Sequence, residues 1–298
     1  MMNYYDEQTV VFYNGKFCRA TEANLSAYAQ SLHYGYAVFE GIRSYSTPGG
    51  PAIFKAAEHF ERMLASCRMM NIPVEYTADE LTALSYQVLK ENKLSDAYLR
   101  PLVFASDANM SLVAPAKSQL LIAAWDWGKY LGDKLLRLTV SPFQRPNPKA
   151  VPMHCKASGQ YVNSTLASTE AKSRGFDEAL LLDMNGNVAE GPGANFFFEK
   201  NGVLYTPPSG NIFPGITRST VMEIAQSAGI KVEERLFRPD ELIDADAAFF
   251  TGTAAEIVGI ASVDDVVFSK PYSETHGAFL AEAYRSLVTG NVEVESYL

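Results

Sequence analysis

A lysine stands in the segment Met153-His154-Cys155-Lys156-Ala157-Ser158-Gly159-Gln160-Tyr161-Val162-Asn163, where an extended, proline-marked run meets a helical pattern. Residues 134–140 alternate as a β-strand does, whereas polar side chains recur at helical spacing over 161–168. A lysine at such a corner holds its amine beyond the element ends. This placement suits a Schiff-base lysine, because the neutral amine attacks an aldehyde and partial burial lowers its pKa. Lys156 is therefore a candidate nucleophile, and an ordinary surface lysine is the alternative.

Length and composition restrict the classes of function. A chain of 298 residues favours two domains, and 47% hydrophobic with 20% charged residues describes an ordinary globular protein. A formal charge of -9 argues against nucleic acid or an anionic membrane as partner. No apolar run reaches the roughly 18 residues of a spanning helix, and the first residues do not resemble a signal peptide, so we expect a cytoplasmic protein. Three cysteines and four histidines are scattered, which argues against a metal site.

Turn and periodicity signals predict an α+β chain. Asn-Gly pairs at 14–15, 185–186 and 201–202 lie between short apolar runs, as in tight hairpins. Residues 58–71 and 77–88 show the apolar spacing of amphipathic helices, the second opened by a capping box at Thr77 and Glu80. We expect a small domain over 1–125, a linker over 126–135 and a larger domain over 136–298.

The stretch 38–43 is expected to be one strand. It would then place Phe39, Gly41 and Arg43 on one face. An aromatic, a glycine and an arginine are unusual for plain packing, and the glycine would let a flat molecule approach the backbone closely. This face is a candidate part of a binding pocket.

Three later segments could bind charged groups. Glu190 precedes Gly191-Pro192-Gly193, where a carboxylate can be aimed into a cavity, although a surface glutamate is an equal alternative. A helix is predicted to start at Ile216 and Thr217, whose unpaired amides make a natural phosphate seat, and a plain capped helix start is the alternative. The small-residue turn at Thr253-Ala254 presents further amides. Neither a dinucleotide fingerprint nor a nucleotide phosphate loop is present.

Together these groups match what pyridoxal phosphate needs: an amine for its aldehyde, a carboxylate for its pyridine nitrogen, and donors for its phosphate. Over nearly its whole length the chain resembles the class IV, fold type IV pyridoxal-phosphate enzymes, and within them the branched-chain amino-acid aminotransferases. The blocks that carry the resemblance occur in the family's order: His33-Tyr-Gly, Phe39-Glu-Gly-Ile-Arg43, Glu58-His-Phe-Glu-Arg62, Tyr98-Leu-Arg-Pro101, Lys156-Ala-Ser-Gly-Gln-Tyr161, Glu190-Gly-Pro-Gly-Ala-Asn195, Pro214-Gly-Ile-Thr-Arg218 and Gly252-Thr-Ala-Ala-Glu256.

The resemblance implies a two-domain fold type IV architecture, with a smaller α/β first domain and a larger β-barrel-like second domain. It implies that Lys156 forms the internal aldimine and moves the proton at the substrate Cα, and that Glu190 holds the pyridinium nitrogen. Tyr161 would bond the phenolic oxygen of the cofactor. The phosphate seat would comprise Arg62, Ile216, Thr217 and Thr253, and the amides of Thr253 and Ala254 would receive the substrate α-carboxylate.

The implied reaction is transamination between L-leucine, L-isoleucine or L-valine and 2-oxoglutarate. The implied side-chain pocket is lined by Phe39, Gly41, Tyr98, Trp127 and Tyr130. Arg100 would bind the second carboxylate of glutamate. The neighbouring subunit of a homodimer would lend Tyr34 and the loop from Met110 to Leu112.

The sequence departs from the family pattern at Ser158, Gln160 and Ala194. The first two flank the lysine without removing a chemical group, whereas Ala194 removes a carboxylate that many relatives carry in the Glu190 turn. A D-amino-acid aminotransferase or an aminodeoxychorismate lyase would share the lysine, the glutamate and the phosphate seat. A cofactor-binding protein without catalysis is the non-enzyme alternative, and Lys156, Tyr161 and Glu190 speak against it.

Overall fold

The computed structural model describes residues 4–127 and 134–290, and the chain forms two compact units. Among the described residues, 4–127 and 155–160 belong to the first unit, and 134–154 and 161–290 belong to the second. The short segment around Lys156 thus packs with the first unit. The linker over 126–135 stays a prediction, because most of it lies outside the described residues. Within the described ranges, no helix is both long enough and apolar enough to cross a bilayer.

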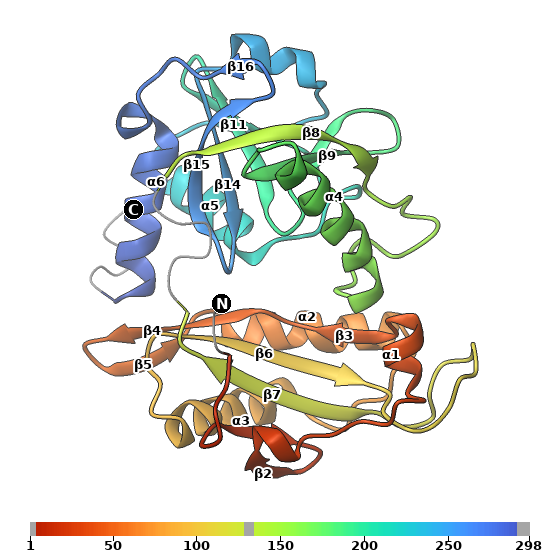
Figure 1. Cartoon of the computed structure of the whole chain (residues 1–298). Coiled ribbons are helices and arrows are strands. Elements are labelled where there is room, and N and C mark those ends of the chain that lie inside the picture. The colour runs from red at the N-terminus through yellow and green to blue at the C-terminus, as the bar shows by residue number, and fades with distance from the viewer. Residues whose placement is uncertain (1–3, 128–133, 291–298) are drawn as a thin grey trace. The chain divides into compact units, whose positions relative to one another are not determined.

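The first unit is built on one seven-stranded antiparallel sheet. Its strands are β1 (Val10–Tyr13), β2 (Lys16–Arg19), β3 (Ala37–Phe39), β4 (Ile42–Thr47), β5 (Gly50–Ile53), β6 (Ala97–Phe104) and β7 (Gln119–Trp125). They lie in the order β2-β1-β7-β6-β4-β5, with β3 also paired to β6 (Figure 1). The helices of this unit are η1 (Ala20–Glu22), α1 (Gln30–Tyr34), α2 (Ala56–Met69), α3 (Ala78–Glu91) and the short η2 (Ser158–Gln160).

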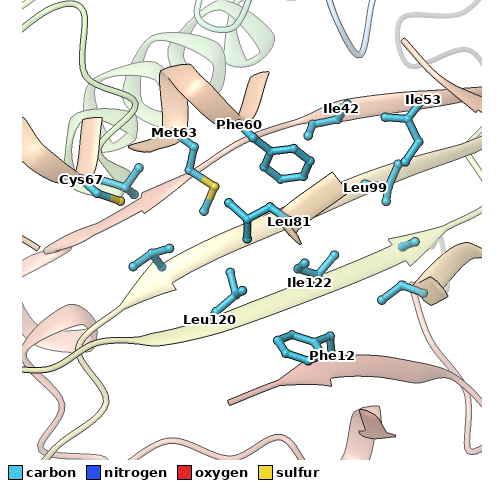
Figure 2. Packing of buried hydrophobic residues seen from close by; sticks show 14 of the residues in the cluster. Phe12, Ile42, Ile53, Phe60, Met63, Cys67, Leu81, Leu99, Leu120 and Ile122 are labelled. Carbon is cyan, nitrogen blue, oxygen red and sulfur yellow. The ribbon is translucent and has the colours of Figure 1, made fainter. Parts of the chain in front are cut away.

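The core of the first unit lies between this sheet and the helices α2 and α3 (Figure 2). The predicted apolar stripe of α2 is confirmed, because Phe60, Met63 and Cys67 are all buried in this core. The predicted capping box is also confirmed. The Thr77 hydroxyl accepts the N–H of Glu80 at 3.2 Å, and the Glu80 carboxylate accepts the N–H of Thr77 at 2.8 Å. Local capping and burial therefore place both helices on the sheet.

The prediction of one continuous strand over 38–43 is wrong, because β3 ends at Phe39 and β4 begins at Ile42. The predicted faces are retained, because the register against β6 is the same on both sides of the break and Val38 and Ile42 point into the core, opposite Phe39 and Arg43. Both strands pair with β6, and between them the N–H of Glu40 donates to the carbonyl of Pro101 at 3.0 Å. Pro101 has no N–H with which to continue the ladder, so regular pairing lapses at this point. The break leaves the Glu40 side chain fully buried.

The second unit is built on a nine-stranded sheet that closes on itself. Its strands are β8 (Leu136–Gln144), β9 (Glu178–Leu182), β10 (Val188–Glu190), β11 (Asn195–Lys200), β12 (Val203–Thr206), β13 (Val232–Glu234), β14 (Ala247–Gly252), β15 (Glu256–Val263) and β16 (Val266–Val267). The path β10-β9-β8-β15-β14-β11 returns to β10 through the pairing of Glu190 with Asn195. The expected α+β fold with a barrel-like second part is therefore confirmed.

Helices accompany this barrel. They are α4 (Tyr161–Ser173), η3 (Pro239–Asp244), η4 (Tyr272–Glu274), α5 (Ile216–Ser227) and α6 (His276–Val288). One core cluster gathers Phe196, Phe198 and Phe250. The intervening Phe197 points to the other face of β11 and stacks on Phe249 with ring centroids 5.0 Å apart. Both faces of the sheet are thus covered, as the apolar runs of β11 and β14 require.

The three predicted Asn-Gly turns are present, in two forms. At Asn14-Gly15 and Asn201-Gly202 both residues have positive φ, between 47° and 85°, as a two-residue hairpin turn requires. The connection at Asn185-Gly186 is longer. Its Asp183 carboxylate accepts the N–H groups of Asn185 at 2.8 Å and Asn187 at 2.9 Å, which organises a wider turn between β9 and β10.

Candidate active site

The backbone of Lys156 is tied to two elements of the first unit. Its carbonyl accepts the N–H of Phe39 at 3.2 Å, and its N–H donates to the hydroxyl of Ser66 on α2 at 3.2 Å. The next residue, Ala157, forms an isolated bridge with Val38 of β3. The Lys156 Nζ lies 5.3 Å from the centroid of the Phe39 ring. The backbone of Lys156 is therefore held by β3 and α2, and the side-chain amine lies beside an aromatic ring.

The residues before Lys156 alternate between core and surface. Cys155 is buried in the core of the first unit, and His154 is exposed. Burial raises the pKa of the Cys155 thiol, which keeps it protonated near neutral pH. Successive residues of an extended segment point to opposite sides, so His154 and Cys155 do not face each other.

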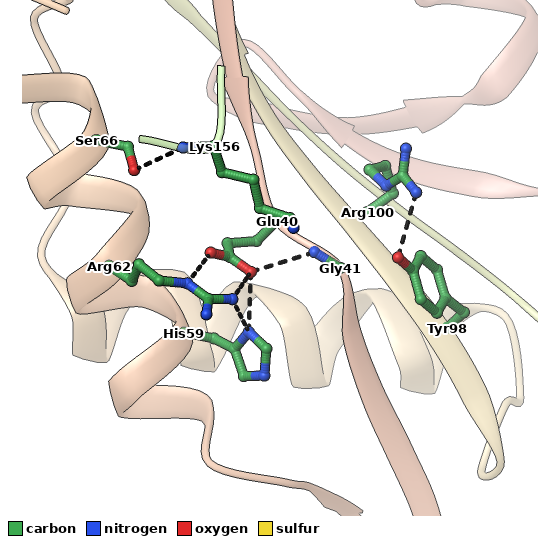
Figure 3. A network of polar contacts seen from close by, with 8 residues as sticks. All are labelled: Glu40, Gly41, His59, Arg62, Ser66, Tyr98, Arg100 and Lys156. Atoms are coloured by element: carbon green, nitrogen blue, oxygen red, sulfur yellow. Dashed lines mark hydrogen bonds and ion pairs between the residues drawn. The ribbon is translucent and has the colours of Figure 1, made fainter. Parts of the chain in front are cut away.

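Arg62 lies in a buried network that contains a carboxylate and an imidazole (Figure 3). Its Nε and Nη2 donate to the two oxygens of Glu40 at 2.7 and 2.8 Å, and His59 Nδ1 lies 2.9 Å from the same carboxylate. Burial raises the pKa of Glu40, but the charge of Arg62 and the hydrogen bonds from His59 and Arg62 outweigh it and hold the pKa well below its usual range. Burial lowers the pKa of His59, against the opposing influence of Glu40.

Three aromatic residues predicted for the substrate pocket, Phe39, Tyr98 and Trp127, form one cluster beside Arg100. The Arg100 guanidinium lies 4.7 Å from the centroid of the Phe39 ring and 5.3 Å from that of Tyr98. Tyr98 stacks on Trp127 with centroids 4.7 Å apart, and its hydroxyl accepts a hydrogen bond from Arg100 Nη2 at 3.2 Å. A Cβ added at Gly41 would lie 1.8 Å from that hydroxyl, so only glycine permits this approach. Tyr130 lies outside the described residues.

The residues expected to serve a neighbouring subunit lie together at the surface of the first unit. The Tyr34 hydroxyl donates to the carbonyl of Met110 at 3.1 Å, and Leu112 is 85% exposed. The buried Gln30 secures this loop, because its amide donates to the carbonyls of Ser111 at 2.7 Å and Val113 at 2.8 Å. These hydrogen bonds therefore hold the loop in a defined conformation that presents apolar side chains to solvent.

Glu190 lies in the second unit at the end of β10, and its carboxylate is almost fully buried. The Arg145 Nε lies 2.9 Å from one oxygen, and the Asn195 amide donates to the other at 3.0 Å. The N–H of Phe213 donates to the same carboxylate at 3.1 Å. The cation of Arg145 and the neutral donors of Asn195 and Phe213 therefore lie around this buried carboxylate.

The start of α5 is linked to this carboxylate. The Asn195 amide that donates to Glu190 also donates to the carbonyl of Phe213 at 2.9 Å, three residues before Ile216. The helix has Gly215 as its N-cap, no side-chain cap and no acidic residue in its first turn. The first-turn amides at Ile216 and Thr217 therefore keep the positive end of the helix dipole without an acidic side chain of their own turn.

A cavity of about 370 Å³ in the second unit joins α4 to two turns. Tyr161 and Ser164 line it from the helix, and Ala194 and Ala254 line it from the turns after β10 and β14. The Ser164 hydroxyl donates to the carbonyl of Pro192 at 2.7 Å, which fixes the glycine turn against α4. The predicted residues Tyr161 and Ala254 thus lie around one end of the barrel with the Glu190 turn, and Thr253 directly precedes Ala254.

The predicted residues fall into two sets, one within each unit. Lys156, Arg62 and the Arg100 cluster belong to the first unit, and the remaining predicted cofactor residues belong to the second. Sequence reasoning missed several polar residues that hold these groups: Glu40, His59, Ser66, Arg145 and Asn195. One signal was available, because His59 and Arg62 are spaced to share a helix face. Among the described residues, no group of three or more His, Cys, Asp or Glu side chains could hold a metal ion.

Comparisons with known proteins agree in family and in fold. The family model for amino-transferase class IV matches residues 37–263. A branched-chain-amino-acid aminotransferase of Pseudomonas aeruginosa is 39% identical over 99% of this chain and 98% of its own length. The crystal structure of the branched-chain amino acid aminotransferase of Escherichia coli superposes with a TM-score of 0.93, at 37% identity over 96% of both chains. The enzyme of the same name from Thermobaculum terrenum, solved in its PLP form, gives a TM-score of 0.90, at 33% identity over 96% of this chain and 95% of its own.

The resemblance noted in the sequence therefore extends over the whole described architecture. The family match covers the helix α2 that carries Arg62, the strand β10 that carries Glu190, and Lys156. Because that match spans most of the chain and the Pseudomonas relative is similar over nearly its full length, the chain belongs to the class IV aminotransferases.

Proposed function

We propose that this chain transfers the amino group between L-branched-chain amino acids and 2-oxoglutarate, with pyridoxal 5'-phosphate as its cofactor. The observation that carries the proposal is the double backbone anchor of Lys156 in a chain whose near full-length relatives are branched-chain-amino-acid aminotransferases. The reaction exchanges an amino group and an oxo group. It therefore needs one amine that can first hold the cofactor and then move a proton.

The residues present fit the cofactor. Lys156 offers the amine for the aldehyde, and the buried Glu190 offers a carboxylate for the pyridine nitrogen. The start of α5 supports a phosphate site, because a helix amino terminus with a glycine N-cap and no acidic first turn attracts an anion. Arg62, Ile216, Thr217 and Thr253 would hold the phosphate, and the Tyr161 hydroxyl would bond the phenolic oxygen.

The bound cofactor supplies an electron sink that acidifies the substrate Cα–H bond. The Lys156 amine would take the proton from Cα and return it at the carbon that receives the amino group. Glu190 would keep its negative charge because Arg145 lies beside it and Asn195 donates to it, and it could therefore hold a proton on the pyridine nitrogen. The amides of Thr253 and Ala254 would orient the α-carboxylate of the substrate.

The Arg100 cluster supports recognition of two kinds of side chain. Phe39, Tyr98 and Trp127 provide apolar surface for leucine, isoleucine and valine, and Tyr130 would extend it. Arg100 already lies over two ring faces, where a cation is favourable. The same guanidinium could bind the second carboxylate of glutamate in a bidentate geometry. The two substrate classes would thus use different parts of one pocket.

A second copy of the chain would complete the assembly. The exposed apolar surface formed by Tyr34, Met110 and Leu112 supports a homodimer in which this loop covers the partner's pocket. We further propose a cytoplasmic location, and the three cysteines support it because each is a free thiol.

The test is the visible absorption spectrum of the purified protein before and after addition of L-leucine. A yellow band that L-leucine bleaches would support the cofactor and the amino-acid half-reaction together. Bleaching by D-alanine and not by L-leucine would move the chain to the D-amino-acid aminotransferases. Absence of a band after addition of pyridoxal 5'-phosphate would contradict the proposal.

A further inference from the structure

One edge of the Arg62 guanidinium is occupied by a buried carboxylate (Figure 3). Glu40 accepts hydrogen bonds from Nε at 2.7 Å and from Nη2 at 2.8 Å, one on each oxygen. The Glu40 side chain is 0% exposed and that of Arg62 is 14% exposed. A guanidinium is planar and its five N–H groups form a rigid fork, so a two-point contact fixes its orientation as well as its position. The edge that carries Nη1 is consequently turned away from Glu40.

Glu40 is itself held in place from two sides. His59 Nδ1 lies 2.9 Å from Oε2, and the N–H of Gly41 donates to the same oxygen at 3.3 Å. His59 and Arg62 are spaced to share one face of α2, and Glu40 lies at the break between β3 and β4. The carboxylate therefore joins the helix to the sheet at the level of Arg62.

The same helix also anchors the candidate amine. Ser66, one turn beyond Arg62 on α2, accepts the N–H of Lys156 at 3.2 Å. The Arg62 guanidinium and the backbone of Lys156 are thus both positioned by the helix α2. A cofactor that has an aldehyde at one end and a phosphate at the other needs a fixed spacing between these two protein groups.

We propose that Glu40 is a positioning residue for the cofactor phosphate: it orients Arg62 so that the opposite edge of the guanidinium is aimed at the phosphate, with His59 holding Glu40. This inference rests on the proposed function, which assigns Arg62 to the phosphate. Glu40 does not touch the cofactor itself. It acts through Arg62, and its own negative charge opposes phosphate binding.

Because of this opposition, the direction in which the affinity for the phosphate changes can test the inference. If Glu40 acted only through its charge, removing the charge would strengthen binding of an anionic phosphate. If it acts by orientation, loss of the two-point contact weakens binding, because a charge-assisted bidentate pair contributes direction as well as energy. Glu40→Asp keeps the charge but shortens the side chain, so only the orientation effect predicts a loss for that variant.

The experiment measures the dissociation constants of the full-length apoenzyme for pyridoxal 5'-phosphate and for pyridoxal, which lacks the phosphate. Their ratio isolates the contribution of the phosphate. We expect a large preference for pyridoxal 5'-phosphate in the unaltered protein, reduced about tenfold or more in Glu40→Asp and Glu40→Gln, with pyridoxal binding unchanged. Glu61→Gln is the matched control, because Glu61 is an exposed neighbour on the same helix, and its ratio should not change.

A double-mutant cycle with Arg62→Lys completes the design. Lysine keeps the positive charge without the fork, so Glu40→Gln should have little further effect on the ratio in that background. An unchanged or increased ratio in Glu40→Asp or Glu40→Gln would overturn the inference while leaving the proposed function intact. Equal loss of both ligands in both variants would assign Glu40 a purely structural role and also overturn it. Lack of any preference in the unaltered protein would overturn the phosphate seat, and the proposed function with it.

Discussion

The Nε of Arg145 lies 2.9 Å from the carboxylate of Glu190, and both side chains are more than nine-tenths buried. Glu190 closes the ring of strands through its pairing with Asn195, so this ion pair belongs to the barrel as well as to the candidate site. Ala194 leaves the adjacent turn without a carboxylate. In this chain the buried Arg145 is therefore committed to Glu190 and not shared with a second acid at that position.

Arg145→Met should destabilise the protein by about 3 to 5 kcal/mol, because it leaves a buried carboxylate without its cation. The measurement is the free energy of unfolding in urea for the apoenzyme. Lys231→Met provides the comparison, since the Lys231 ion pair with Glu233 is largely exposed and its loss should leave the unfolding midpoint unchanged. An Arg145→Met protein as stable as the unaltered one would contradict the structural part of this argument.

Lys156→Ala should abolish turnover while the protein still binds pyridoxal 5'-phosphate noncovalently. The amine is lost, whereas the anchors to Phe39 and Ser66 use only main-chain atoms of Lys156 and remain possible. Single-turnover kinetics with L-leucine and equilibrium dialysis of the cofactor would check the two halves of the prediction. Lys149→Ala, in the exposed stretch before Lys156, should retain full activity. Retained transamination in Lys156→Ala would remove the lysine from its assigned role.

Arg100→Ala should reduce kcat/KM for L-glutamate by roughly 30- to 100-fold and that for L-leucine by less than about threefold. The reason is that only glutamate presents a second carboxylate to the guanidinium. Arg100→Lys should fall between the two, because it keeps the charge and loses the bidentate contact. Equal losses for the two amino acids in Arg100→Ala would leave Arg100 as a packing residue over Phe39 and Tyr98.

Gly41→Ala should disturb the pocket through Tyr98. The added Cβ would lie 1.8 Å from the Tyr98 hydroxyl, and the ring cannot easily yield because it stacks on Trp127. We expect a loss of about 1 to 3 kcal/mol of stability and a raised KM for L-leucine. Gly49→Ala, where the nearest atom would be 3.7 Å away, is the control and should match the unaltered protein. Normal kinetics in Gly41→Ala would show that Tyr98 moves freely.

The network of Glu40 and His59 should make the first unit less stable in acid. Both groups have a pKa lowered in the folded state, so the unfolded chain binds more protons and stability falls as pH falls. The loss should begin near pH 6.5, the ordinary pKa of a histidine, and continue below pH 4.5, the ordinary pKa of a glutamate. Urea midpoints of the apoenzyme across this range would measure it. His59→Gln should flatten the upper part of the curve, and an unaltered slope would contradict the assignment.

Much of the fold could be predicted from the sequence because its signals are local. The capping box at Thr77, the apolar stripe of α2 and the turn at Asn14-Gly15 each depend on a few neighbouring residues, and each is present. The break at Glu40 could not be predicted in this way. It depends on Pro101, a residue of a different strand that happens to lie opposite and lacks an N–H.

The same contrast between local and distant signals applies to the candidate site. Lys156, Glu190 and the start of α5 could be singled out because each stands beside a proline, a glycine or a helix signal. The residues that hold them could not, since Arg145 meets Glu190 and Ser66 meets Lys156 only after the chain has folded. Partners distant in sequence leave no periodic pattern to detect.

The short segment 155–160 has a consequence for how the protein is made. It completes the first unit by pairing with β3, yet it is synthesised after the whole of β8, which belongs to the second unit. While the ribosome is still adding residues 134–154, the edge of β3 therefore lacks its partner and exposes unpaired backbone groups. The first unit therefore cannot finish folding until β8, the first strand of the second unit, has been synthesised. A fragment that ends before the segment should consequently be prone to aggregation, because nothing would cover that strand edge.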